Sequence, residues 1–422
     1  MRRLHSLVPV LFLAATAGFI GSFTHAVEGQ GPQEAASGFL NSPVPGFYAG
    51  TTAEQQAAFD ADKVAFVEQE VIDDGLGPVY NAQSCGECHQ NPLIGGISQV
   101  AELRAGHLVG STFVDAPGGS LINDRSIDAE FQERVPGAEN VRTLRMSNNV
   151  LGDGFVEAIN SNTIVAIANA QPGQSGGLIA GQVIQIPVLE SPGAVRVGRF
   201  GWKNQHASLL SFSSDAYLNE MGITNRFNLT ENTSLGRSVA SIDDVPDDQP
   251  CSSNASVNCG EDGGEDIDVF ARFMRATRAP GRGPINADAA VGSGLFNQIG
   301  CTICHTPSIT TAAVGTVING GALTVPAALG NKVIHPYSDF LLHDIGTGDG
   351  IVQNGGQSTA NKLRTRPLWG VRTNARHMHD GTSLTFNQSI LRHGGEAIGV
   401  INNYRNLNAT QQNQIISFLQ SL

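Results

Sequence analysis

The chain is poor in basic residues and in aromatic side chains. It holds 25 Lys and Arg against 38 Asp and Glu among 422 residues, a net charge of −13, and only 6% of its residues are aromatic. An acidic chain repels phosphate backbones, which argues against nucleic acid as a partner. Few aromatics combined with 50 glycines predict a loop-rich chain, in which a cofactor fills core volume that side chains leave open.

The chain also lacks long apolar runs, apart from one near its start. Residues 7–20 form that run; Arg2 and Arg3 precede it, and the small residue Ala26 follows it. This pattern predicts a signal peptide over residues 1–26 and export to the periplasm. An uncleaved membrane anchor is the alternative, although the run is shorter than the roughly 20 residues that a spanning helix needs. Cleavage would change the net charge to −15, because the segment holds two basic residues and no acidic ones.

Six cysteines fall into three pairs, and two of these pairs carry a histidine. Cys85 and Cys88 precede His89, and Cys301 and Cys304 precede His305 in the same C-x-x-C-H pattern. Two thiols on one turn can form thioethers with the two vinyl groups of a porphyrin, and the histidine then binds the iron. A four-cysteine zinc site is disfavoured because the pairs lie 216 positions apart. A thioredoxin-like pair would not place a histidine after the second cysteine twice. The sequence therefore predicts two covalently bound haem c groups.

The third pair, Cys251 and Cys259, encloses a polar loop without a nearby histidine. In an oxidising compartment this spacing predicts a disulfide without a catalytic role.

The pattern of apolar residues places a helix ahead of each haem motif. Helical spacing is predicted over residues 53–70 and 286–300, and over 407–422 at the end of the chain, where Asn408 is the expected cap. Residues 181–200 alternate in period two about a Ser-Pro-Gly turn, which predicts a β-hairpin. A further helix is expected over residues 267–277, after a polar surface segment at 240–266.

These elements together predict a mainly α fold with two cytochrome c-like haem domains, a small β-hairpin insertion and many loops. The Gly- and Pro-rich segment 278–284 is the expected linker. We therefore expect an N-terminal haem domain with insertions over residues 27–284 and a C-terminal cytochrome c domain over residues 285–422.

Beyond the haem motifs, the sequence resembles the di-haem oxidoreductases of the bacterial cytochrome c peroxidase and MauG superfamily. The matching stretches lie at residues 151–159, 198–203, 219–224, 335–346, 366–370, 379–381 and 393–397. The resemblance implies two haem lobes, with peroxide reacting at the N-terminal haem and electrons handled by the other. Because members of the superfamily act on different substrates, it implies the architecture more closely than the substrate.

The resemblance also suggests which residue caps the second haem opposite His305. The peroxidases carry a methionine twelve residues past the glycine of a His-Asp-Gly motif, and here that position is His393. We therefore expect His393 as the distal iron ligand, with Met378 as the next candidate. His377 and His379 are weaker alternatives, and a surface histidine without metal is another. A His/His pair lowers the reduction potential relative to His/Met.

At the first haem, the superfamily uses a distal glutamate to move a proton between the peroxide oxygens. Glu157 lies in a matching stretch and is the candidate, although an acidic residue near a helix N-terminus can be merely solvated. His107 could cap this haem, but a lone histidine in a Gly-rich loop is more often exposed.

Three further residues are candidates by their place in the matching stretches. Trp202 is the candidate for an electron relay between the haems, with packing against a porphyrin as the alternative that also applies to Trp369. Arg199 and Lys203 flank Trp202 and are expected to pair with haem propionates. Calcium occurs in the superfamily, but no dense acidic motif here requires it.

The sequence thus predicts a periplasmic di-haem c oxidoreductase that reduces hydrogen peroxide or a similar oxidant. Its expected partner is a small periplasmic electron donor such as a cytochrome or cupredoxin, and it would meet the membrane only through the export signal. One alternative is an electron-transfer cytochrome with both irons six-coordinate. The other is a MauG-like oxidase or oxygenase that acts on a protein or polymer.

Overall fold

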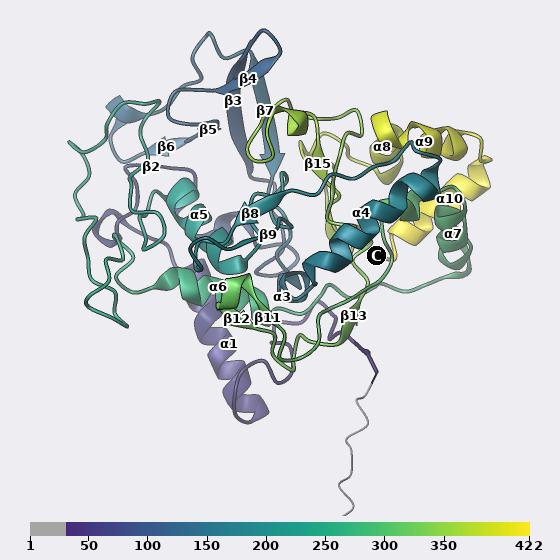
Figure 1. Ribbon diagram of the computed structural model, residues 1–422, viewed down its shortest axis with the longest axis horizontal. Helices are drawn as coiled ribbons and strands as arrows, with labels where there is room; N and C mark the ends of the chain where they lie inside the picture. Colours follow the sequence, from purple (N-terminus) through teal and green to yellow (C-terminus); the bar gives the residue numbers. More distant parts are fainter. Residues whose placement is uncertain (1–30) are drawn as a thin grey trace, which may run out of the picture. The chain divides into compact units, whose positions relative to one another are not determined.

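The computed structural model describes residues 31–422, and residues 32–422 form one compact unit (Figure 1). The predicted signal peptide lies outside the described residues. Within them, no helix combines the length and apolar character needed to cross a membrane. The α-helices are α1 (Thr52–Val67), α2 (Cys85–Cys88), α3 (Asp153–Glu157), α4 (Ser161–Ser175), α5 (Leu209–Met221), α6 (Asp266–Ala276), α7 (Ala287–Gln298), α8 (Phe386–Leu391), α9 (Ile398–Arg405) and α10 (Ala409–Leu419).

Three of the four predicted helices begin at side-chain caps, and the helix at Asp266–Ala276 begins without one. Thr51 and Glu54 form a capping box at the start of α1, and Asn408 caps α10 as expected. The helices predicted over 53–70, 267–277, 286–300 and 407–422 are confirmed as α1, α6, α7 and α10, with ends one to three residues away from the prediction. Helix ends are the least certain part of such a prediction because the terminal turn depends on tertiary contacts.

The strands within residues 31–422 are short and form six small sheets. They are β1 (Gln33–Glu34), β2 (Val79–Tyr80), β3 (Ala101–Val109), β4 (Thr112–Asp115), β5 (Leu121–Ile122), β6 (Arg125–Ser126), β7 (Val141–Met146), β8 (Gln185–Pro187), β9 (Val195–Val197), β10 (Ile309–Thr310), β11 (Val317–Ile318), β12 (Leu323–Thr324), β13 (Lys332–Ile334), β14 (Leu342–His343) and β15 (Leu363–Arg364). The predicted hairpin is confirmed: β8 and β9 pair antiparallel, with Gln185 opposite Val197.

The expectation of one small β-hairpin was nevertheless incomplete. β3 pairs with β4, β5 and β7, all antiparallel, in a four-stranded sheet that stands away from the helices (Figure 1). Its longest pairing joins Ala101–Val109 to Val141–Met146, whose partners are about 40 residues apart in sequence. Pairing over such a distance is decided by tertiary packing, and the short strands carry little signal of their own.

Two hydrophobic cores hold the helices together. The larger core packs α1, α3, α5 and α6 around Phe66, Phe155 and Phe273. The smaller core packs α7 against α10, and these two helices lie side by side in Figure 1. Gly292 permits this close approach, because a Cβ there would collide with the backbone of Gln414. Residues between 309 and 341 belong to the larger core although they follow the predicted boundary after residue 284, and that boundary stays a prediction.

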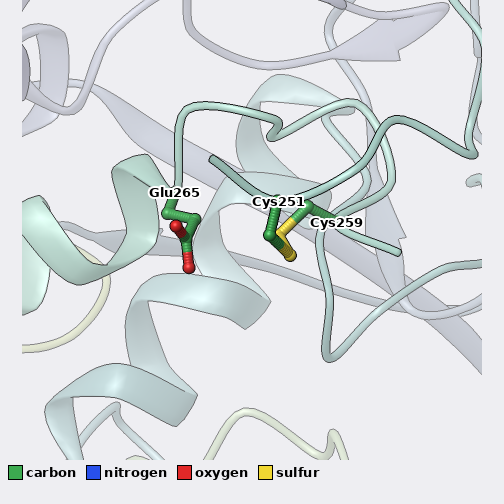
Figure 2. Close-up of side chains that lie close together, drawn as sticks. All are labelled: Cys251, Cys259 and Glu265. Atoms are coloured by element: carbon green, nitrogen blue, oxygen red, sulfur yellow. A yellow bond between two sulfur atoms is a disulfide. The ribbon is translucent and has the colours of Figure 1, made fainter. Parts of the chain in front are cut away.

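The predicted disulfide between Cys251 and Cys259 is confirmed (Figure 2). Glu265 lies beside it at the start of α6, and its carboxylate accepts hydrogen bonds from the hydroxyls of Ser252 and Ser253. The disulfide and these bonds hold the polar loop against the start of α6.

Candidate functional site

The second C-x-x-C-H motif opens onto a cavity. Helix α7 leads into a 3-10 turn at Cys301–Ile303, and Cys301, Cys304 and His305 all line the cavity. About 1270 Å³ is free of protein atoms there, counting the part open to solvent. The walls are mostly apolar, including Phe296, Leu363, Leu368, Ile390, Val400 and Leu419.

His393 lines the same cavity as His305, as the proposed ligation requires. His393 follows α8, and Phe386 and Ile390 of that helix line the cavity too, as the predicted helical spacing implies. The two imidazoles are close enough that His393 contributes to the pKa of His305, which burial and this neighbour lower to about 4. Burial also lowers the pKa of His393. Both rings are therefore neutral near pH 7, the state in which imidazole binds iron.

Met378, the second candidate, also lines the cavity, at a backbone φ of 65°. His377 and His379 line it as well. The Nδ1 atom of His379 is buried without a hydrogen-bond partner among the described residues. Several candidate ligands thus share one wall of the cavity.

The first motif presents its histidine in the same way as the second. Cys85 and Cys88 lie on α2, and the Nδ1 atom of His89 is 3.2 Å from the carbonyl oxygen of Gly96. The backbone of Asn148 also acts on this imidazole and raises its pKa. Burial lowers the pKa of His89 and raises that of the Cys88 thiol to about 12. The thiols stay protonated, unlike the thiolates that bind zinc.

The donor set of these residues fits haem. In each of the three proposed iron ligands, Nδ1 faces a backbone carbonyl: Gly96 for His89, Tyr337 for His305 at 3.0 Å, and Ser389 for His393 at 2.8 Å. Such a bond fixes the tautomer and leaves Nε2 free to bind a metal. At the second site, the thiol pair and the apolar cavity complete the match.

Glu157 is fully buried, and its carboxylate is engaged on both oxygens. Arg275 donates from Nε at 2.6 Å and from Nη2 at 3.0 Å, while the amide of Leu209 and the side chain of Asn319 each donate at 2.9 Å. Burial alone would raise the pKa of Glu157, but Arg275 and the other donors lower it to about 2. A carboxylate held in this way favours a structural role over proton transfer.

A pair of carboxyl groups that the sequence did not single out lies near Cys88. Glu220, on α5, and Glu102, on β3, both act on the pKa of the Cys88 thiol. The two groups share a hydrogen bond. Burial and the charge of Glu102 raise the pKa of Glu220 to about 8, while Arg104 binds Glu102 at 2.7 Å and keeps it ionised. This pair can hold one proton near neutral pH.

Trp202 lines the cavity of the second C-x-x-C-H motif. Its indole Nε1 donates to the carbonyl of Met146 at 2.8 Å, and its ring contacts His379 edge-on. Trp369, the other tryptophan, packs in the larger core. Trp202 is thus placed against the residues around the second motif.

Arg199 and Lys203 are buried, but neither lines the cavity. Arg199 donates to carbonyls, among them that of Val197 at 3.1 Å, and to the Ser161 hydroxyl. Lys203 is 2.9 Å from Asp349 and also bonds two carbonyls. Burial lowers the pKa of Lys203 to about 8. Their donors already have partners within the protein.

Two other arginines, Arg364 and Arg366, do line the cavity. The Arg-x-Arg spacing could have identified them, because arginines with no acidic residue nearby in sequence are uncommon in a buried segment. His343 was also missed, although its stretch matched the family. It lies 2.9 Å from both Asp339 and Glu396, and so connects the chain after His393 to β14.

The remaining polar candidates lie elsewhere. His107 is on β3 and pairs with Glu139 at 2.9 Å. Glu231, Asp247 and Glu261 bring carboxylate oxygens within 4.8 Å of one another. Calcium stays an expectation of the resemblance.

Comparison with known proteins gives one family match. The model of the family described as "Di-haem oxidoreductase, putative peroxidase" matches residues 125–422, a stretch that includes the second C-x-x-C-H motif and starts after the first. No curated protein matches the chain.

Solved structures give remote matches. The chain is similar to hydrazine synthase from Kuenenia stuttgartiensis, with 12% identity, a TM-score of 0.37, and coverage of 98% of this chain and 99% of that one. It is similar to a MauG-like protein associated with microbial copper homeostasis, with 14% identity, a TM-score of 0.39 and 93% of each chain covered. The chain is also similar to the diheme peroxidase BthA from Burkholderia thailandensis, with 12% identity and a TM-score of 0.31. That match covers 76% of this chain and 94% of BthA.

Proposed function

Because the chain belongs to the di-haem oxidoreductase family, we propose that it is an exported c-type enzyme that reduces hydrogen peroxide. The observation that carries the proposal is the pair of C-x-x-C-H motifs, each with its histidine held through Nδ1 by a backbone carbonyl. Haem attached at both motifs would supply iron that binds peroxide at one centre and transfers electrons at the other.

The second haem is the electron-transfer centre in this proposal. Cys301 and Cys304 would hold its porphyrin, and His305 and His393 would bind its iron. Two strong protein ligands leave no place for peroxide, so this centre passes electrons. The shared cavity and the proximity of the two imidazoles support the assignment. Met378 is the alternative distal ligand.

The first haem, on Cys85, Cys88 and His89, is the proposed site of peroxide binding. Trp202 lines the cavity of the second motif and is the proposed relay of electrons between the two centres. Each centre belongs to its own proposed domain, over residues 27–284 and 285–422.

Two groups are candidates for moving a proton between the peroxide oxygens. Glu157 is the group that the family resemblance supplies, but it would first have to leave Arg275. The Glu102–Glu220 pair is the second candidate, because it holds a proton close to Cys88 of the first motif. General acid–base groups need a pKa near the working pH, which favours Glu220.

The disulfide supports the proposed export to the periplasm, and the acidic charge supports the proposed electron-donor partner. The proposed signal peptide over residues 1–26 would deliver the protein to the periplasm. The disulfide between Cys251 and Cys259 suits an oxidising compartment. An acidic protein suits a small electron donor with a basic rim, a cytochrome or a cupredoxin.

The test is production of the protein with a working c-type maturation system, followed by mass spectrometry and absorption spectroscopy. We expect the mass of the mature chain plus two haems, one low-spin centre, and one centre that responds to peroxide and cyanide. Reduced donor should then be oxidised by peroxide. A protein with only low-spin haem and no response to either ligand would be an electron carrier, and the peroxidase proposal would fall.

A further inference from the structure

Arg364 and Arg366 are two cations that line the cavity of the second haem motif; Arg364 is buried and Arg366 is half-buried. Arg364 is the last residue of β15, which pairs antiparallel with β14 next to that cavity. Arg366 follows two residues later, and the charge of its neighbour and the burial of its guanidinium together lower its pKa to about 10. Arg364 and Arg366 therefore bring two like charges into a cavity whose lining is mostly apolar.

Neither arginine forms an ion pair with a carboxylate in the part of the chain that the structure describes. Arg364 is only 5% exposed; it donates to the carbonyl of Arg199 at 3.0 Å and to Oδ1 of Asn148 at 3.2 Å, and its Nε has no partner. The carboxyl group of Asp153 influences Arg364 from a distance, without a hydrogen bond. Arg366 makes no hydrogen bond within residues 31–422. Its guanidinium lies over the ring of Trp202, with the Cζ atom 5.9 Å from the ring centroid.

Several other buried cations of the described chain have carboxylate partners. Arg145 and Lys203 share Asp349, and Arg275 pairs with Glu157. A buried guanidinium with free donors is unfavourable unless an anion meets it. Two neighbouring guanidinium groups in a haem cavity fit two carboxylates, because guanidinium and carboxylate match in geometry and charge. The haem itself carries two carboxylates, its propionates.

We infer that Arg364 and Arg366 bind the propionates of the second haem. Arg364 also bonds the side chain of Asn148, whose backbone acts on the pKa of His89. Because Arg366 contacts the ring of Trp202, propionates bound by the two arginines would lie near Trp202 and Asn148. The inference rests on haem occupying the cavity and does not depend on peroxide as the oxidant.

The test uses the full-length holoprotein with Arg364→Gln and Arg366→Gln, each examined by intact mass and by spectroelectrochemical titration. Arg405→Gln is the matched control, since it removes the same charge from an exposed position at the end of α9. At the wild-type midpoint, half of the second haem is reduced. We expect that fraction to fall to about a tenth or less in either cavity variant, because loss of a cation close to the haem favours the ferric state. The control should stay at one half.

Lysine variants guard against failure of the glutamine variants to fold or to retain haem. Arg364→Lys and Arg366→Lys keep the charge but lose the fork, so they should shift the propionate bending bands in the resonance Raman spectrum. Their midpoints should move less than those of the glutamine variants. Wild-type midpoints in both glutamine variants, or wild-type propionate bands in both lysine variants, with two haems still attached, would overturn the inference. No readout uses peroxide, so an absence of peroxide turnover would reject the proposed function and leave this inference standing.

Discussion

Arg275 donates hydrogen bonds to the carboxylate of Glu157 from two nitrogen atoms, at 2.6 and 3.0 Å, in the interior of the larger core. This pair joins α3 to α6, which contact each other in the larger core.

Loss of the Glu157 charge should therefore destabilise the fold. Glu157→Gln leaves Arg275 buried without its partner, which typically costs about 3–5 kcal/mol. The pKa of Glu157 is about 2 when folded and near its usual value of 4.5 when unfolded. A depressed folded pKa gives stability that is complete above the unfolded value and is lost as pH falls toward 2. Urea unfolding should show that the wild type has a higher free energy of unfolding than Glu157→Gln, and that this difference is full at pH 7 and shrinks below about pH 4.5. A difference in the free energy of unfolding that does not depend on pH would contradict the ion pair.

Peroxide turnover should distinguish the two proton-transfer candidates. If the Glu102–Glu220 pair moves the proton, Glu220→Gln should lower kcat about 100-fold or more with both haems attached and the fold intact. Glu157→Gln would then reduce turnover only as far as it reduces the folded fraction. Unchanged turnover in Glu220→Gln would remove this pair from the mechanism and return the role to Glu157.

Ligation of the second haem can be tested at His393. His393→Ala should convert this centre from low-spin to high-spin, or to a His/Met spectrum if Met378 takes its place. His335→Ala is a suitable control, because His335 is exposed and pairs with Glu34. An absorption and electron paramagnetic resonance spectrum identical to wild type would refute the ligation.

His343 should hold the segment that carries His393. Its ring lies 2.9 Å from Glu396, three residues after His393, and 2.9 Å from Asp339. His343→Gln leaves two carboxylates without their cation, so we expect a loss of about 3 kcal/mol or more in the free energy of unfolding. The low-spin signal of the second haem should weaken as the segment loosens. A destabilised protein with an unaltered haem spectrum would limit His343 to a structural role.

Removal of the disulfide should affect stability without changing the haems. The chain-entropy model gives a loop this short about 2–3 kcal/mol. The double variant Cys251→Ser, Cys259→Ser should therefore unfold at lower urea concentration and keep both haem spectra. Loss of haem from this variant would show that the loop supports the first centre.

Local sequence determined the covalent framework of this protein. The C-x-x-C-H motifs, the capped helices ahead of them, the hairpin at β8 and β9 and the disulfide could be predicted because neighbouring residues specify each of them. The placement of His393 in the cavity of His305 was also predictable, from helical spacing and the resemblance to the family.

Tertiary structure decided which charges are satisfied. From sequence, Glu157, Arg199 and Lys203 were indistinguishable from free functional groups, yet the fold supplies each with partners that lie tens or hundreds of residues away. The same fold leaves Arg364 and Arg366 without carboxylates in the haem cavity. Whether a buried charge is neutralised depends on long-range packing, and no local pattern records that.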